Sequence, residues 1–347
     1  MEEAFGEEQL MAPLTKLFGQ KITKFPGMMP TSVDRTNVSL LQFGYCASSK
    51  ADGDAVLGFI HDNKLVLMRR NKQTKSFLLS TNFKKDFVFD GEYIAHRNRF
   101  LIFDTLVFQS EPLYRENYPI RIELANYFIN ELCPKTELHL YRNTIIADDT
   151  VKPLPSNYTH GITWKTETIS LQVKPPYAAW DAAQLWYNRN LLPYGCDGII
   201  FTRLWCGYRP FSEDLEAVLK WKEEVTADFL VKTNAKDKIA CDQYGNAIYL
   251  PQQWAFPADC EQQNALLYSL YNADAVPVSS CVLINEEQKL LATNQICEFA
   301  WNKELCIWVW IRSRTDKLTP NNVHTVIACV KSMRDNITIE EIAEAAS

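Results

Sequence analysis

The sequence predicts an α+β protein of two domains, in which antiparallel sheets with a few helices precede a small β-barrel. The chain has 347 residues, 47% of them hydrophobic, which is enough to bury two cores. β-Branched and aromatic runs separated by polar turns dominate residues 56–108. After residue 225 the strand-like runs become shorter and more closely spaced, as is typical of a small barrel. We therefore expect one domain over residues 1–225 and a second over 226–347, with the C-terminal helices in the second.

The elements of the first domain follow from local patterns. Residues 1–35 form a lead-in that ends in KFPGMMPTSVDR, a stretch too broken by Pro and Gly to be a long helix. The runs AVLGFI, KLVLMR, SFLLS and RFLIFDTLVF predict strands, and CDGIIFTRLW and AVLKWK predict two more. A helix is expected over YPIRIELANYFINEL, with Pro119 at its first position and Ile122, Phe128 and Ile129 on one face. A second helix fits AAWDAAQLWYNRNLL, which is followed by a proline and a glycine.

The second domain is expected to contain mostly short strands. These are TADFLVK, KIACD, AIYL, SCVLI, ICEFAWN and CIWVWI, the last of which leads into RSRTDKLTPN. The final thirty residues carry helical spacing that is interrupted at Asn336. The pattern therefore predicts a barrel followed by two helices.

Composition excludes several classes of protein. A net charge of -6 and a pI of about 5.5 disfavour a strongly basic, non-specific nucleic-acid binder. The ten cysteines are scattered without a Cys-x-x-Cys pair, and the acidic N-terminus MEEAFGEEQL has no apolar signal region. We therefore expect reduced thiols in a cytosolic or nuclear protein without a zinc site. No apolar run reaches the roughly 20 residues that a membrane span requires.

Charged residues embedded in apolar strands carry the functional signal. They are Lys50 in KADG, Asp90 and Glu92 in DGEYI, Asp197 in CDGIIFT, Lys220 and Lys222 in LKWK, and Arg312, Arg314, Asp316 and Lys317 in IRSRTDKL. Each group alone is more simply explained as a turn, a solvated strand edge or an exposed ion pair. Together they supply what attack on a nucleoside triphosphate requires: a nucleophile, cations for the phosphate charge, and carboxylates for a metal ion and for the sugar.

Other chemistries have weaker support in the sequence. The chain has no G-x-x-x-x-G-K-[ST] loop and no G-x-G-x-x-G loop. Its five histidines show no metal-ligand spacing. A Cys/His catalytic pair stays open as an alternative, although no motif marks one.

The order of these motifs resembles that of the mRNA capping enzyme guanylyltransferases, within the covalent nucleotidyltransferase superfamily that includes DNA and RNA ligases. FPGMMPTSVDR resembles the family's lead-in and KADG its nucleophile motif, while DGEYI and FLIFDTL resemble the next two motifs. CDGIIFT, LKWK and IRSRTDKLTPN follow in the family's order, with ICEFAWN resembling the strand before the last motif. The matches extend from Phe25 to Asn321. The resemblance implies a nucleotidyltransferase domain with ATP-grasp-like antiparallel sheets, followed by an OB-fold barrel.

The resemblance also implies roles for the residues in these motifs. Lys50 would take GMP from GTP in a phosphoramidate bond, Glu92 would meet the ribose, Phe103 would stack near the guanine, and Asp197 would support the metal or the lysine. Lys220 and Lys222 would hold the α-phosphate, while Arg314 and Lys317, with Arg312 and Asp316 nearby, would orient the β- and γ-phosphates. The implied cofactor is Mg²⁺ or Mn²⁺, and the acceptor is RNA with a 5′-diphosphate end.

One departure keeps other functions open. Family members commonly carry arginine two residues after the glycine of KxDG, where this chain has Ala55. The alternatives are an ATP-dependent polynucleotide ligase and a catalytically degenerate scaffold. The resemblance further predicts that RNA triphosphatase and cap methyltransferase activities come from other chains. It also predicts association with an RNA polymerase, and a location in the nucleus, or in the cytoplasm if the protein is viral.

Overall fold

The computed structural model divides the chain into two compact units, one of residues 1–221 and 338–347 and one of residues 222–337. The structure describes residues 15, 25–132, 163–165, 169–208, 216–230, 267–271, 277–282, 295–302, 307–315, 317 and 319–347. The strands expected at Lys238–Asp242 and Ala247–Leu250, and the side chain of Asp316, lie outside these residues. Within them, no helix is long and apolar enough to cross a membrane.

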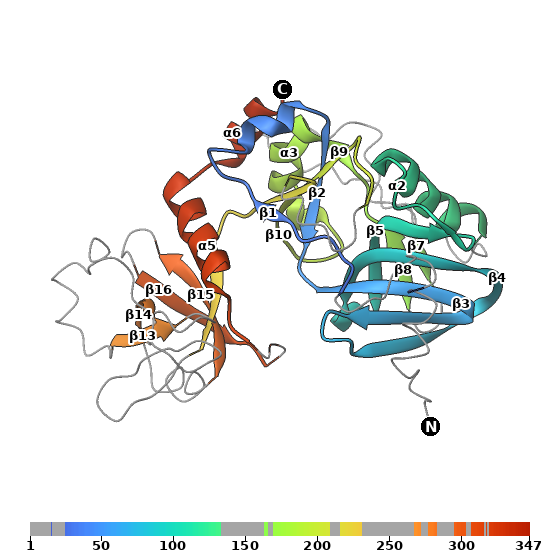
Figure 1. Ribbon diagram of the computed structural model, residues 1–347, viewed down its shortest axis with the longest axis horizontal. Coiled ribbons are helices and arrows are strands. Elements are labelled where there is room, and N and C mark those ends of the chain that lie inside the picture. The colour runs from blue at the N-terminus through green and yellow to red at the C-terminus, as the bar shows by residue number, and fades with distance from the viewer. Residues whose placement is uncertain are drawn as a thin grey trace. The chain divides into compact units, whose positions relative to one another are not determined.

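Unit 1 contains two β-sheets (Figure 1). The larger has the order β3-β4-β5-β8-β7, formed by Asp54–Arg69, Thr74–Ile94, Arg99–Phe108, Ser170–Val173 and Thr163–Lys165, and β6 (Glu111–Pro112) pairs with β5. The smaller has the order β1-β11-β10-β2-β9, formed by Thr31–Ser32, Val218–Trp221, Cys196–Arg203, Tyr45–Ala51 and Tyr177–Ala178. The sheets are mixed, because β5 pairs in parallel with β8 and β1 with β11. The expectation of purely antiparallel sheets is therefore wrong at these two pairs, each of which joins strands separated by a long crossover.

The core of unit 1 lies between the larger sheet and helix α2 (Tyr118–Tyr127), which continues as a π-helical turn (Phe128–Leu132). Phe128 is fully buried and its ring centroid lies 4.8 Å from that of Phe87 and 5.0 Å from that of Phe89. Ile122 and Ile129 are buried in the same cluster, as their helical spacing predicted. The same cluster contains Phe100 and Phe108 of β5, so the helix packs on both β4 and β5.

Short helices complete unit 1. They are α3 (Ala182–Tyr187), α6 (Ile339–Ala345) and the 3₁₀ turns Val38–Gln42, Ala95–Arg97, Ala179–Asp181 and Arg189–Leu191. Asn336 ends helix α5 (Val323–Asp335) in the left-handed conformation with φ 42°, which separates the two C-terminal helices at the predicted break. Helix α6 then begins with a capping box between Thr338 and Glu341. Its buried residues Ile339 and Ile342 pack against α3 and the first 3₁₀ turn.

The position of α6 corrects the domain assignment for this segment. Both C-terminal helices were expected in the second domain, but residues 338–347 belong to unit 1. The apolar face of α6 is buried in unit 1, because α3 and the turn after β1 present a partly apolar surface to it. No sequence pattern reveals which of two neighbouring domains supplies that surface.

Unit 2 is built from five strands and one long helix. The strands are β12 (Thr226–Leu230), β13 (Leu267–Tyr271), β14 (Pro277–Val282), β15 (Ile296–Asn302) and β16 (Ile307–Ser313). They pair in the closed order β12-β13-β14-β16-β15, with β14 and β16 parallel and the other pairs antiparallel. Helix α5 (Val323–Asp335) packs beside β12, and Asn322 caps its first turn by accepting a hydrogen bond from the Thr325 N–H.

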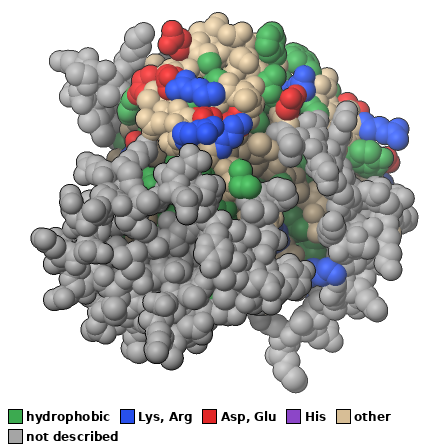
Figure 2. Space-filling model, turned by 60° about the vertical axis from the view of Figure 1, so that its left-hand side comes forward, with side chains coloured by type: hydrophobic (Ala, Val, Ile, Leu, Met, Phe, Trp, Pro, Cys, Tyr) green, Lys and Arg blue, Asp and Glu red, His purple; other side chains and the backbone are tan. Residues whose placement is uncertain are grey.

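Surface charge agrees with the composition. On the face drawn in Figure 2, Lys and Arg side chains of the described residues lie among Asp and Glu side chains. The described residues on that face therefore form no single basic surface, in keeping with the net charge of -6.

Candidate active site

Lys50 lies on β2 in the smaller sheet of unit 1, between β10 and β9. Its Nζ donates a hydrogen bond to Asp197 Oδ1 at 2.7 Å, and the two side chains are 22% and 33% exposed. The lysine is therefore a half-buried strand residue with a carboxylate partner, and not a residue of a solvated loop. The loop in KADG begins only at Asp52, after the end of β2.

A β-bulge brings Asp197 to Lys50. Gly198 pairs with Lys50 and Cys196 pairs with Ala51, so Asp197 is an extra residue on β10 with no partner of its own on β2. A bulge turns one side chain out of the regular alternation, and bulges often do this beside active sites. Because of it, the carboxylate reaches the amine on the neighbouring strand.

A second bulge presents Phe103. On β4 and β5, Asp90 pairs with Asp104 and Gly91 pairs with Ile102, which leaves Phe103 as the extra residue. Gly91 permits this close approach, because a Cβ there would lie 2.3 Å from the Phe100 ring and 2.5 Å from the Leu101 carbonyl oxygen. Gly91 of DGEYI is therefore required because neighbouring strands pack closely at this position. Its sequence context had suggested a turn instead.

These strands enclose a cavity of about 170 Å³ within unit 1. Its charged lining residues are Lys50, Arg70, Asp90, Glu92, Asp104 and Lys174, and its other lining residues include Phe103, Ser48, Ala55 and Tyr208. The nucleophile, ribose and base-stacking candidates predicted from the sequence therefore share one cavity. We call it the nucleotide cavity from here on.

Glu92 is held from two directions. The N–H of Gly53, in the KADG motif, hydrogen-bonds its carboxylate. Burial raises the pKa of Glu92, while the positive charges of Lys174, Lys50 and Arg70 oppose that rise. A Cβ at Gly53 would lie 2.9 Å from the Glu92 side chain and 2.8 Å from the Tyr93 carbonyl oxygen, so this position requires glycine.

Lys174 is a cavity residue that sequence reasoning missed. Its side chain is buried, its Nζ donates to the Ser49 carbonyl oxygen at 2.7 Å, and it lies 5.0 Å from the centroid of the Phe103 ring. Burial lowers the pKa of Lys174 to about 8, although Glu92 opposes the shift. The only signal in the sequence was a lysine directly after the short apolar run SLQV, which resembles many strand ends.

Asp90, which the sequence singled out, and Arg70, which it did not, line the same cavity. Burial raises the pKa of Asp90 to about 7, against the hydrogen bond that Tyr208 donates to it. Arg70 is exposed, lines the cavity beside Ala55, and its charge acts on both Asp90 and Glu92. An arginine therefore reaches the cavity even though the usual one after KxDG is replaced by alanine.

The two lysines of LKWK lie in different places: Lys220 belongs to the sheet beside the cavity, and Lys222 belongs to unit 2. Lys220 on β11 pairs with Ile200, which in turn pairs with Ser48, so the three residues lie in one row on one face of the sheet. Ser48 and Ile200 line the cavity, and Lys220 therefore lies on the face that bounds it. Lys222 follows the last residue of β11, is half-buried and falls in unit 2.

The predicted phosphate-binding cations of unit 2 are held by acidic residues. Arg314 Nη1 lies 3.0 Å from Asp228 Oδ1 and 3.5 Å from Glu298 Oε2, and Lys317 also forms an ion pair with Asp228. Arg312 Nε lies 2.8 Å from Glu298 Oε2. Asp228 is buried on β12 and is another residue that the sequence did not single out. The structure thus gathers three of the four predicted residues in one cluster, and the fourth, Asp316, is outside the described residues.

The carboxylates of the described residues limit how a metal ion could bind. Among the described residues, no group of three or more His, Cys, Asp and Glu side chains could hold a metal ion. Mg²⁺ is commonly held by one or two carboxylates, with substrate phosphates and water completing the octahedron. Asp197, a single carboxylate beside the nucleophile, is suited to hold a metal ion that binds together with the substrate phosphates. One carboxylate is too few to hold a metal ion by protein ligands alone.

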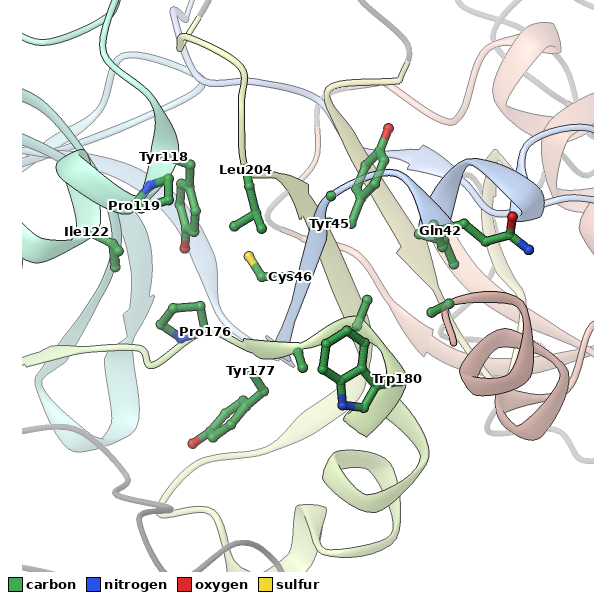
Figure 3. A pocket seen from close by; sticks show the side chains of 15 residues that line it. Gln42, Tyr45, Cys46, Tyr118, Pro119, Ile122, Pro176, Tyr177, Trp180 and Leu204 are labelled. Atoms are coloured by element: carbon green, nitrogen blue, oxygen red, sulfur yellow. The ribbon is translucent and has the colours of Figure 1, made fainter.

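Unit 1 has a second cavity, of about 380 Å³, and Figure 3 shows the side chains that line it. Tyr118 lines both, and its hydroxyl donates to the Phe103 carbonyl oxygen at 3.1 Å. The lining of the second cavity is mainly apolar and aromatic and includes no charged side chain. It therefore offers no cationic side chain to a phosphate group.

Family models decide the relationship of the chain to known proteins. The model of the mRNA capping enzyme catalytic domain matches residues 4–224, and that of the mRNA capping enzyme C-terminal domain matches residues 224–343. The chain belongs to the mRNA capping enzyme family. The two matches meet at residue 224, close to the expected domain boundary.

Individual relatives in the capping enzyme family are distant in sequence. An mRNA-capping enzyme of Caenorhabditis elegans is 24% identical, over 97% of this chain and 51% of that protein. The mRNA-capping enzyme subunit alpha of Yarrowia lipolytica is 25% identical, over 97% of this chain and 86% of the relative. The chain therefore spans about half the length of the C. elegans relative and most of the fungal one.

Solved structures of DNA ligases also align with the chain at low sequence identity. A mycobacterial DNA ligase D complexed with ATP and MES aligns with a TM-score of 0.44 and 14% identity, covering 84% of this chain and 96% of that one. The ligase domain of M. tuberculosis LigD aligns with a TM-score of 0.38.

Proposed function

We propose that the protein is an mRNA guanylyltransferase, which transfers GMP from GTP through a lysyl-N-GMP intermediate to the 5′-diphosphate end of RNA. The observation that carries the proposal is the placement of Lys50, with Asp197 2.7 Å away, in a cavity also lined by Glu92 and Phe103. Membership of the capping enzyme family supports it.

The first half-reaction needs a neutral amine at Lys50. Asp197 is the carboxylate in direct contact with Nζ, and we propose that it accepts the proton that the amine loses. The nitrogen lone pair then attacks the α-phosphorus of GTP. The N–P bond forms while the bond from the α-phosphorus to the bridging oxygen breaks, and pyrophosphate leaves. Lys220, on the face that bounds the cavity, is suited to meet the α-phosphate charge.

The second half-reaction reverses the roles at the amine. A terminal phosphate oxygen of the RNA diphosphate attacks the same phosphorus, the P–N bond breaks, and Lys50 leaves after taking a proton. The product is RNA with a GpppN end. An enzyme that removes the terminal phosphate of triphosphate RNA must supply the acceptor, and a methyltransferase would act on the product.

Lys174 and Phe103 favour guanine as the base. The Phe103 ring offers a stacking surface, and the Lys174 ammonium beside it can donate hydrogen bonds. Guanine presents an acceptor, O6, where adenine presents the N6 amino donor. A buried ammonium would therefore stabilise bound guanine and oppose adenine. Glu92 is placed as the acceptor for ribose hydroxyls.

A divalent metal, Mg²⁺ or Mn²⁺, would be held by Asp197 together with phosphate oxygens of GTP. When bound, it would neutralise part of the charge that develops on the leaving pyrophosphate. We also propose that the closed five-strand order of unit 2 is an OB-fold and that the protein acts in the nucleus, or in the cytoplasm if it is viral. Separate triphosphatase and methyltransferase chains and an RNA polymerase are the proposed partners.

Labelling with radioactive nucleotide tests the proposed function. The protein is incubated with α-labelled GTP or ATP and Mg²⁺ or Mn²⁺, then resolved by denaturing electrophoresis. We expect label from GTP and at least about tenfold less from ATP, as one discriminating hydrogen-bonding group predicts. Equal or greater labelling by ATP would support the ligase alternative. No labelling by either nucleotide, with or without metal, would support a degenerate scaffold.

The cations of unit 2 are expected to act in only one half-reaction. We propose that Arg314 and Lys317 contact the β- and γ-phosphates, which have left before RNA attacks. Arg314→Gln or Lys317→Gln should therefore slow adduct formation from GTP by about 10²-fold or more, a typical effect of losing a charge-stabilising group. Transfer of GMP from a preformed adduct to diphosphate RNA should change by less than about threefold.

A stability control accompanies these two variants, since each leaves Asp228 with one cation fewer. General damage to unit 2 would slow both half-reactions to the same extent. Arg312→Gln provides a matched comparison, because Arg312 is exposed and its ion pair is with Glu298 of the same cluster. Equal loss in both steps, or loss in neither, would contradict the proposed role.

A further inference from the structure

The lead-in segment, residues 25–33, forms one wall of the nucleotide cavity. Phe25, Met28 and Pro30 contribute to the lining of that cavity. All three side chains are apolar, so this wall can exclude water from bound nucleotide but cannot bind its phosphates. The segment has no regular structure before β1 and depends on tertiary contacts for its position.

One end of the lead-in segment is fixed by the smaller sheet. Thr31 and Ser32 form β1 and pair in parallel with Leu219 and Lys220 of β11. The Val33 N–H also donates to the Lys220 carbonyl oxygen at 2.8 Å. This end therefore has backbone partners of its own.

The other end is fixed by the hydroxyl of Tyr208. The Met28 N–H donates to the Tyr208 oxygen at 3.1 Å, the Pro26 carbonyl oxygen lies 3.4 Å from it, and the hydroxyl donates to Asp90 Oδ2 at 2.5 Å. Tyr208 is 1% exposed, and its ring packs in a cluster against which Phe25 and Met28 also pack. A single oxygen atom thus joins the lead-in segment to β4 of the larger sheet.

Phe25 is also held in place by its contacts with Gly27 and Arg70. A Cβ on Gly27 would lie 2.2 Å from the Phe25 ring, so the ring folds directly over the glycine. The same ring lies 5.8 Å from the guanidinium carbon of Arg70, another cavity residue. Any larger residue at position 27 would therefore force the ring to leave its present position.

We infer that Tyr208 is a positioning residue for the nucleotide, because its hydroxyl ties the lead-in segment to Asp90 and so fixes the apolar wall of the cavity. Tyr208 takes no part in bond making. Its loss should weaken ground-state and transition-state binding alike, which raises KM for GTP and leaves kcat nearly unchanged. The inference rests on the proposed function where it predicts a KM for GTP. Its prediction for amide hydrogen exchange at Met28 does not depend on that function.

Tyr208→Phe is the direct test, since it removes the hydroxyl and keeps the ring packing. We expect the KM for GTP in adduct formation to rise about three- to tenfold, as loss of one or two neutral hydrogen bonds predicts. The rate at saturating GTP should change by less than about twofold. Amide hydrogen exchange at Met28 should become faster by a similar factor, because that N–H loses its acceptor.

Two further variants keep the test decisive. Gly27→Ala should raise the KM for GTP by displacing Phe25, without touching the hydroxyl or either sheet, so it replaces Tyr208→Phe if that variant does not fold. Tyr93→Phe is the matched control. Its hydroxyl is also engaged by hydrogen bonds, with Asn98 at 2.6 Å and Lys75 at 2.7 Å, but none of the three lines the cavity. Tyr93→Phe should leave both the KM for GTP and exchange at Met28 unchanged.

The outcomes separate this inference from the proposed function. If wild-type protein forms no adduct with GTP, the proposed function fails, while exchange at Met28 still tests the hydroxyl contact. If the wild type is labelled and both Tyr208→Phe and Gly27→Ala keep its KM, the wall has no role in binding and the inference is overturned. Faster exchange without a change in KM overturns it as well.

Discussion

Lys50→Arg should give a folded protein that forms no detectable covalent adduct with GTP. Arginine keeps the positive charge beside Asp197, but its guanidinium does not lose its proton in proteins and so provides no nucleophile. We expect adduct formation to fall by at least about 10³-fold, since the covalent route is removed and not merely slowed. The measurement is the amount of labelled, acid-labile protein after incubation with α-labelled GTP and Mg²⁺.

The matched control for this prediction is Lys85→Arg. Lys85 is an exposed lysine on β4, so the same substitution there should leave labelling at the wild-type level. Lys50→Arg should also unfold in denaturant within about 1 kcal/mol of wild type, because the ion pair with Asp197 is partly solvated. Wild-type labelling of Lys50→Arg would exclude Lys50 as the nucleophile.

Arg121→Met should produce the largest loss of stability in unit 1. Arg121 donates from Nε to Asp104 Oδ1 at 2.7 Å and from Nη2 to Asp104 Oδ2 at 2.9 Å, and the side chains are 1% and 5% exposed. Its Nη1 also donates to the carbonyl oxygens of Glu116 and Cys206. Methionine would leave a buried carboxylate and two carbonyls without this partner, which we expect to cost about 3–5 kcal/mol of unfolding free energy.

Arg35→Met provides the comparison for the buried pair. Arg35 lies 2.9 Å from Glu341 in a pair whose side chains are 50% and 41% exposed, so its loss should cost no more than about 1 kcal/mol. The measurement is equilibrium unfolding in urea, followed by a signal from unit 1. A cost for Arg121→Met below that of Arg35→Met would mean that water reaches Asp104.

The ion pair between Arg121 and Asp104 also helps to shape the nucleotide cavity. Asp104 is adjacent to Phe103 in the bulge of β5, and it lines the nucleotide cavity. Arg121 on α2 therefore helps to fix the strand segment that presents the base-stacking ring. Neither residue was singled out from the sequence, because an Asp in FDTL and an Arg in YPIRIEL resemble ordinary surface positions.

Part of this protein could be predicted from sequence because it depends on local chemistry. Strand runs, the buried face of Ile122, Phe128 and Ile129, and the helix break at Asn336 follow from side-chain periodicity and backbone preference. The order of the motifs was sufficient to identify the family, since it is a linear property of the chain. It also singled out Lys50, Glu92, Phe103 and Asp197 as candidates, and the structure places the first three in the lining of one cavity and Asp197 against Lys50.

Only the tertiary structure decided which further residues join them. Asp197 meets Lys50 because of a bulge, and a bulge depends on how two strands pair, which neither strand specifies alone. Tyr208 lies 180 positions from Met28 and 118 from Asp90, yet its hydroxyl contacts both. Lys174 enters the cavity only because β8 pairs in parallel with β5, and α6 leaves the second unit for the first because its apolar face is covered there. Such contacts arise from sheet register and from packing between distant segments. The energies of these long-range contacts cannot be predicted from local sequence patterns.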